Sequence, residues 1–101
     1  MMQTLLDRVI NSTNKALKET ELHFDFSVAL SSRPQPEVQI LLKETNKDSQ
    51  FESNTEHRVT RPISLNHQMH ILRVVPTYNL VKQNKKLIET LTEIIALNLG
   101  D

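Results

Sequence analysis

The stretch LHFDFSVAL, residues 22–30, decides the fold of this chain, because its large apolar residues occupy every second position. The apolar positions are Leu22, Phe24, Phe26, Val28 and Leu30. Residues two apart lie on the same face of a β-strand, so this alternation predicts a strand with one buried face. It also predicts that Phe24 and Phe26 are core residues, with Asp25 on the opposite face.

A second strand follows at once. Pro34 and Pro36 interrupt the alternation, since proline lacks a backbone donor and has a restricted φ. Apolar residues alternate again over residues 38–42, so we expect this strand to return antiparallel to the first. Residues 45–49 read as a polar turn.

The next two predicted strands differ in character. Residues 50–61 are weakly apolar, which is typical of a strand at the edge of a sheet, where another chain can add on, and Pro62 is expected to end it. Residues 63–75 are strongly apolar. Their alternation changes phase near Ile71 and Leu72, which predicts a bulge there.

A helix is predicted at each end of the chain. Apolar residues recur at three-and-four spacing over about residues 3–19, with Thr4 as N-cap and Asp7 three residues later. A longer helix begins within residues 79–84, and Gly100 is a suitable stop. The order of elements predicts a two-layer α+β domain, in which an antiparallel sheet of three to four strands is flanked in sequence by an N-terminal and a C-terminal helix.

Length and composition narrow the class of protein. At 101 residues, we expect a single domain over residues 1–101, and such a small domain gains stability from self-association. The chain has no cysteine, twelve basic and twelve acidic residues, and no apolar run long enough to span a membrane. We therefore expect a cytoplasmic protein that binds neither membranes nor polyanions by net charge.

Catalytic and metal-binding patterns are weak. Gly100 is the only glycine, so the glycine-rich loops that cradle phosphates and the nucleophile elbow of hydrolases cannot be built. The candidates for a small enzyme are Asp25 and the four histidines, His23, His57, His67 and His70. Their spacing indicates no joint metal site, so we expect no metal, no cofactor and no catalytic residue, and the enzyme remains a minor alternative.

A second alternative is nucleic-acid binding. Lys82, Lys85 and Lys86 form the one basic cluster, near the start of the last helix, where a helix N-terminus can help to hold a phosphate. The balanced net charge argues against this function. A solvated lysine face explains the same cluster.

The leading hypothesis is a non-enzymatic protein-interaction domain, such as an adaptor, an inhibitor or a chaperone-like subunit, which forms a homodimer. The last helix carries two apolar rows. One row is Leu80, Leu87 and Ile94, and the other is Val81, Ile88 and Ile95. We predict that one row packs on the sheet while Val81, Ile88 and Ile95 meet a partner, although the sheet and the first helix can also absorb both rows.

Overall fold

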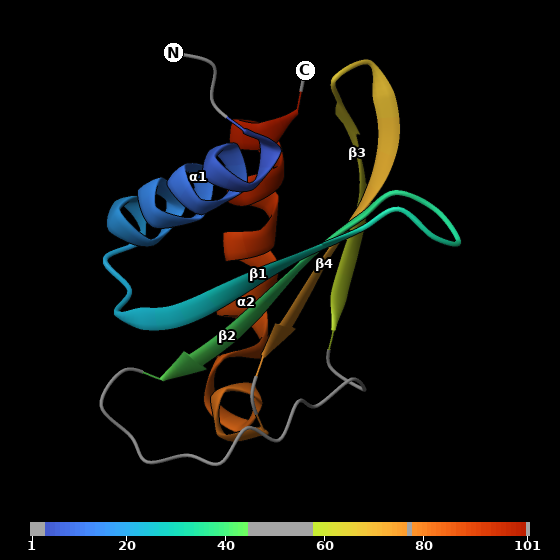
Figure 1. Ribbon diagram of the computed structural model, residues 1–101. Helices are drawn as coiled ribbons and strands as arrows, with labels where there is room; N and C mark the ends of the chain where they lie inside the picture. The colour runs from blue at the N-terminus through green and yellow to red at the C-terminus, as the bar shows by residue number, and fades with distance from the viewer. Residues whose placement is uncertain (1–3, 45–57, 77, 101) are drawn as a thin grey trace.

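The computed structural model describes residues 4–44, 58–76 and 78–100, and for Glu44 and residues 78–84 it describes the backbone alone. Along the chain, one helix precedes the four strands and a second helix follows them (Figure 1). The elements are α1 (Leu5–Glu19), β1 (Phe24–Ser31), β2 (Glu37–Glu44), β3 (Val59–Leu65), β4 (Gln68–Pro76) and α2 (Tyr78–Leu99). The predicted α+β class, with a helix at each end of the sheet-forming segment, is confirmed.

The four strands form one mixed sheet in the order β1-β2-β4-β3. β1 pairs antiparallel with β2, and β3 pairs antiparallel with β4, but β2 and β4 run parallel. The prediction of a wholly antiparallel sheet was therefore wrong at this central pair. β4 ends in three consecutive buried residues, Val74, Val75 and Pro76, and a strand that is apolar on both faces is best covered in the middle of a sheet.

A two-residue turn, Asn66 and His67, joins β3 to β4, and both residues have positive φ, 50° and 61°. Two such residues make a type I′ turn, whose twist suits a tight hairpin. The predicted fourth strand over residues 63–75 was wrong because the chain reverses at this turn. The register between the strands is continuous from Val59 to Leu65, without a bulge, so the change of phase marks the hairpin itself.

The sequence suggested that Pro62 ends a strand, but Pro62 lies inside β3. Ile71, its register partner in β4, donates its N–H to the carbonyl of Pro36 at 3.0 Å, so the backbone of Ile71 is directed towards β2. Pro62 consequently directs its own backbone away from β4, and its missing N–H breaks no bond of the sheet. β3 is an edge strand, as expected, although residues 50–57 of the predicted strand lie outside the described residues.

The ends of both helices follow their sequence signals. Thr4 is the N-cap of α1, and its hydroxyl accepts a hydrogen bond from the N–H of Asp7 at 3.1 Å, as predicted. α2 begins at Tyr78, one residue earlier than the predicted range. It stops before Gly100, whose N–H donates to the carbonyl of Ala96 at 2.9 Å.

The core lies between the sheet and a layer formed by both helices (Figure 1). Buried residues alternate with partly exposed ones along β2, so only one face of the sheet is turned to the helices. The fully buried large side chains come from every element except β1: Ile40, Leu42, Leu65, Leu72, Ile88, Leu91, Ile95, Leu99, Val9, Val38 and Val74. β1 contributes half-buried residues to this core, which leaves it the least covered strand among those described.

Candidate protein-interaction site

β1 is one edge of the sheet, and the directions of its backbone groups follow from the hydrogen bond at Pro36. The carbonyl of Pro36 accepts a hydrogen bond from the N–H of Ile71 in β4. The backbone groups of every second residue after Pro36 therefore point towards β4, and the backbone groups of the residues between them point towards β1. Gln39 and Leu41 therefore bond to their register partners in β1, Ala29 and Ser27.

The remaining residues of β1 direct their N–H and C=O groups away from the sheet. These residues are Phe24, Phe26, Val28 and Leu30, and we call their outward backbone groups the β1 edge. Among the residues that the structure describes, β1 pairs only with β2. The β1 edge is therefore a complete row of donors and acceptors that another strand can use.

The two edges of the sheet differ in how they are protected. Proteins commonly blunt an exposed edge with proline, with lysine or other charged residues, or by making the strand short. β3 carries Pro62 at an outward-directed position, and Arg61 lies next to it. β1 has eight residues, FDFSVALS, with no proline, glycine or basic residue, and Asp25 is its only charge. On these grounds β1, and not β3, is the edge open to pairing.

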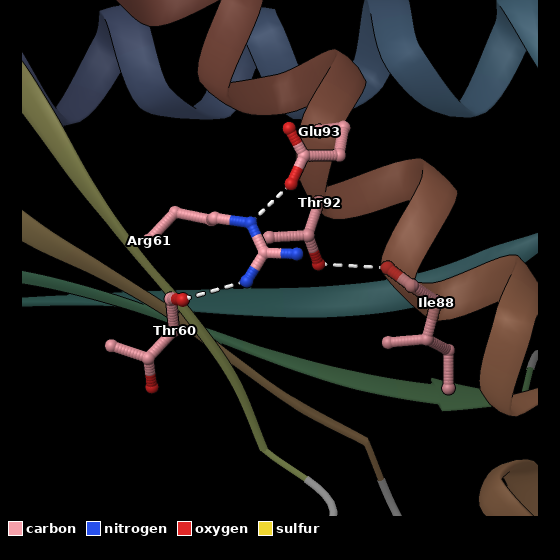
Figure 2. A network of polar contacts seen from close by, with 5 residues as sticks. All are labelled: Thr60, Arg61, Ile88, Thr92 and Glu93. Atoms are coloured by element: carbon pink, nitrogen blue, oxygen red, sulfur yellow. Dashed lines mark hydrogen bonds and ion pairs between the residues drawn. The ribbon is translucent and has the colours of Figure 1, made fainter.

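A polar contact also joins β3 to the helix layer (Figure 2). Arg61 reaches from β3 to the carboxylate of Glu93 on α2, and its guanidinium donates a second bond to the carbonyl of Thr60 at 2.9 Å. Beside Glu93, the buried hydroxyl of Thr92 donates to the carbonyl of Ile88 at 2.7 Å within α2. The contact between Arg61 and Glu93 therefore ties the β3 side of the sheet to α2, whereas the other two bonds lie within β3 and within α2.

A hollow of about 820 Å³ lies where α1 ends and β1 begins. It is lined by Asn14, Leu17, Lys18, Glu21, Leu22, His23 and Phe24. Leu17, Leu22 and Phe24 supply an apolar surface, and the polar residues surround it. The volume is within the range of small-ligand clefts and is ample for one or two side chains of a partner. We call it the Phe24 hollow.

The end of α1 shapes this hollow through a Schellman motif. The N–H of Leu22 donates to the carbonyl of Leu17 at 2.9 Å, and the N–H of Glu21 donates to the carbonyl of Lys18 at 3.1 Å. Glu21 occupies the left-handed position with φ of 57°. The motif turns the chain sharply, so that Leu22 packs back on the core beside Leu17 and β1 starts under the helix.

A second, smaller hollow of about 460 Å³ lies at the other end of β1. It is lined by Leu5, Leu30, Ser31, Ser32, Pro36, Gln68 and His70. Leu30 is 43% exposed, although it belongs to the apolar, helix-facing side of β1. The helix layer thus leaves apolar side chains accessible at both ends of this edge strand, and Phe24 and Phe26 are half-buried where full burial was predicted.

Two of the three residues predicted to meet a partner on the last helix lie in the core of the domain itself. Ile88 is 1% exposed and Ile95 is 0% exposed, and both belong to the core cluster of the chain itself. The side chain of Val81 lies outside the described residues. Of the other row, Leu87 and Ile94 are partly buried. The described members of both rows are therefore turned largely inward, because α2 packs against the sheet and against α1.

The residues of the alternative functions are dispersed. Lys85 and Lys86 are exposed on α2, and the side chain of Lys82 is outside the described residues. Asp25 and His23 are both exposed near the start of β1. Within the described ranges, no three histidine or acidic side chains are grouped so that they could hold a metal ion.

The other histidines lie at the β3–β4 hairpin or beyond the described residues. His67 is in the turn, and His70 is buried, with Nδ1 3.0 Å from the carbonyl oxygen of Gln68. His57 lies outside the described residues. The residues proposed from the sequence for an enzyme are thus not brought to one place in the described structure.

Comparison with known protein families, with curated proteins and with solved structures finds no match to this chain. None of the helices in the described ranges has the length and apolar character needed to cross a membrane. The candidate site therefore depends on the geometry of β1 alone. Sequence reasoning missed it because the alternation in residues 22–30 predicts a strand with one buried face and does not indicate whether that strand lies at an edge of the sheet. The signal that could have found it is the lack of any proline, glycine or basic residue across an alternating strand.

Proposed function

We propose that this chain is a non-enzymatic protein-interaction domain that binds an extended segment of its partner along the β1 edge. The observation that carries the proposal is the open row of backbone groups of Phe24, Phe26, Val28 and Leu30, on an eight-residue strand that has no proline, glycine or basic residue and whose only charge is Asp25. Strand addition of this kind is a recurring mode of peptide recognition.

Main-chain hydrogen bonds and side-chain contacts have separate roles in this mode of binding. The outward N–H and C=O groups bond to the backbone of the added strand and supply affinity regardless of its sequence. Every second side chain of the added strand then lies on the helix side of the sheet, in line with Phe24 and Phe26. The Phe24 hollow can take one such side chain, so the domain selects segments with apolar residues at alternate positions.

The test is a proline placed at an outward position of β1. Leu30→Pro removes one outward N–H and leaves the bonds to β2 in place, as Pro62 does naturally in β3. Leu30→Ala is the matched control, because it removes the same exposed side chain and keeps the N–H. Leu30→Lys is a second variant that keeps the backbone donor and adds an edge charge.

The probe is a set of ten-residue peptides selected by the purified domain from a displayed random library. We expect the selected peptides to alternate apolar and polar residues, and to bind Leu30→Pro about tenfold more weakly than Leu30→Ala, from the loss of one hydrogen bond and the obstruction by the ring. Slowed amide exchange at Phe26 and Val28 in the complex should accompany binding. Selected peptides that bind both variants equally, or that lack the alternation, would refute strand addition at β1.

Thermal unfolding of each variant shows whether it remains folded before binding is compared. If Leu30→Pro is unfolded, Leu30→Lys provides the test in its place. A peptide affinity of Leu30→Lys equal to that of Leu30→Ala then counts against the proposal.

A further inference from the structure

We infer that the strand added to the β1 edge is β1 of a second copy, paired antiparallel with Ser27 opposite Ser27, so that two four-stranded sheets become one of eight strands. The inference rests on the proposed function and specifies its partner. A two-fold pair of this kind is closed, since each copy uses its β1 edge on the other.

The direction of the backbone groups restricts how two copies of β1 can pair. Only the even-numbered residues 24–30 direct bonds outward, so an even residue must lie opposite an even residue. Among registers that satisfy this condition, the one centred on Ser27 is the only one that pairs all four outward-directed residues of β1 with those of the second copy. Both helix layers then lie on the same face of the joined sheet, because opposite residues share a face.

In this register the side chains of β1 in one copy are complementary to those of β1 in the other. On the helix side, Phe24 lies opposite Leu30, and Phe26 lies opposite Val28, so every pair is apolar. On the other side, Asp25 lies opposite Ala29. The single charge of the strand therefore meets no like charge, and the formal net charge of the chain is zero, so two copies do not repel each other through net charge.

The shape of the two ends supports the same register. The exposed side chain of Leu30 stands at one end of β1, and the Phe24 hollow lies at the other. Antiparallel pairing brings Leu30 of one copy beside Phe24 of its partner, and the two-fold axis repeats the contact. An exposed apolar side chain is thereby brought to the apolar residues of the Phe24 hollow, Leu17, Leu22 and Phe24, twice in each dimer.

Disulfide trapping tests the register, because the natural chain has no cysteine. Ser27 opposite Ser27 is a pair whose backbone groups point away from each other, for which Cα atoms are about 4.5 Å apart, a separation that a disulfide can bridge. Asp25→Cys and Ala29→Cys are matched controls on the same exposed face. In the proposed register each of these cysteines is four residues from its copy, about 13 Å along the strand, too far for a disulfide.

Under mild oxidation at tens of micromolar, Ser27→Cys should form a covalent dimer at least tenfold faster than either control. Sedimentation of the natural chain should show a dimer, and Leu30→Pro should shift it towards monomer while Leu30→Ala does so less. Equal trapping of all three cysteine variants, or faster trapping of a control, would overturn the register.

A natural chain that stays monomeric up to about a hundred micromolar would overturn the inference as a whole. The proposed function is tested separately. If the monomer binds peptides with alternating apolar residues and Leu30→Pro weakens that binding, only the identity of the partner is wrong. If Leu30→Pro alters neither peptide binding nor association, the β1 edge is not the interaction site and both ideas fail.

Discussion

Glu21 is held in a left-handed backbone conformation at the end of α1, and its replacement by glycine should stabilise the fold. Its φ is 57°, and it occupies the position of a Schellman motif that glycine usually fills. A Cβ atom is crowded in this conformation, whereas glycine adopts it freely. The hydrogen bonds that end α1 are made by the backbone, so Glu21→Gly keeps them.

The size of the effect is a balance of two terms. Relief of the left-handed conformation is worth about 1–2 kcal/mol, and the greater freedom of glycine in the unfolded chain costs about 0.5–1 kcal/mol. The net gain in unfolding free energy should be about 0.5–1 kcal/mol. For a domain of about a hundred residues, this corresponds to a rise in Tm of about 3–6 °C.

Glu21→Ala separates backbone strain from charge. A carboxylate at the C-terminus of a helix is unfavourable, so removing it alone should stabilise by a few tenths of a kcal/mol. Urea denaturation of the natural chain and of both variants measures the difference. If Glu21→Gly is no more stable than Glu21→Ala, the strain argument is wrong.

Three other substitutions test the packing and the hairpin. Ile95→Ala should lower the unfolding free energy, measured by chemical denaturation, by about 2–5 kcal/mol, since this side chain is fully buried in the domain. If the variant is instead as stable as the natural chain and only self-associates less, the partner role predicted from the sequence is restored. Phe24→Ala should lower the unfolding free energy by about 1.5–2.5 kcal/mol in the same assay, because Phe24 is half-buried on an edge strand. A loss larger than that of Ile95→Ala would contradict the structure. His67→Gly should raise Tm by a few degrees, as the second residue of a type I′ turn favours glycine, and a lower Tm would exclude that turn.

The strands and helices could be predicted from the sequence where a repeating pattern is local. The alternation of residues 22–30 predicted β1 and the face that carries Phe24 and Phe26, and Thr4 with Asp7 predicted the start of α1. The hairpin at Asn66 and His67 was missed because histidine in a left-handed position carries no strong sequence signal. The apolar residues on either side of it could be read as one long strand.

The candidate site was much less predictable. Both apolar rows of the last helix looked alike, and only the packing of α2 across the sheet shows that Ile88 and Ile95 are inside the domain. The strand expected to be open, β3, proved to carry Pro62 at its outward positions and a contact from Arg61 to α2. β1, for which the sequence predicted one buried face, proved to be the edge that is open among the described residues.

By itself, the sequence determined both helices and the first two strands, together with the side of each that is apolar, because these properties depend on residues only a few positions apart. It also excluded glycine-rich phosphate loops and disulfides, since the chain has one glycine and no cysteine. Only the tertiary structure decided that β4 inserts between β2 and β3, so that β1 is left at the edge. The order of strands depends on how the apolar faces of distant segments compete for cover, and whether a backbone group is open to a partner follows from that order.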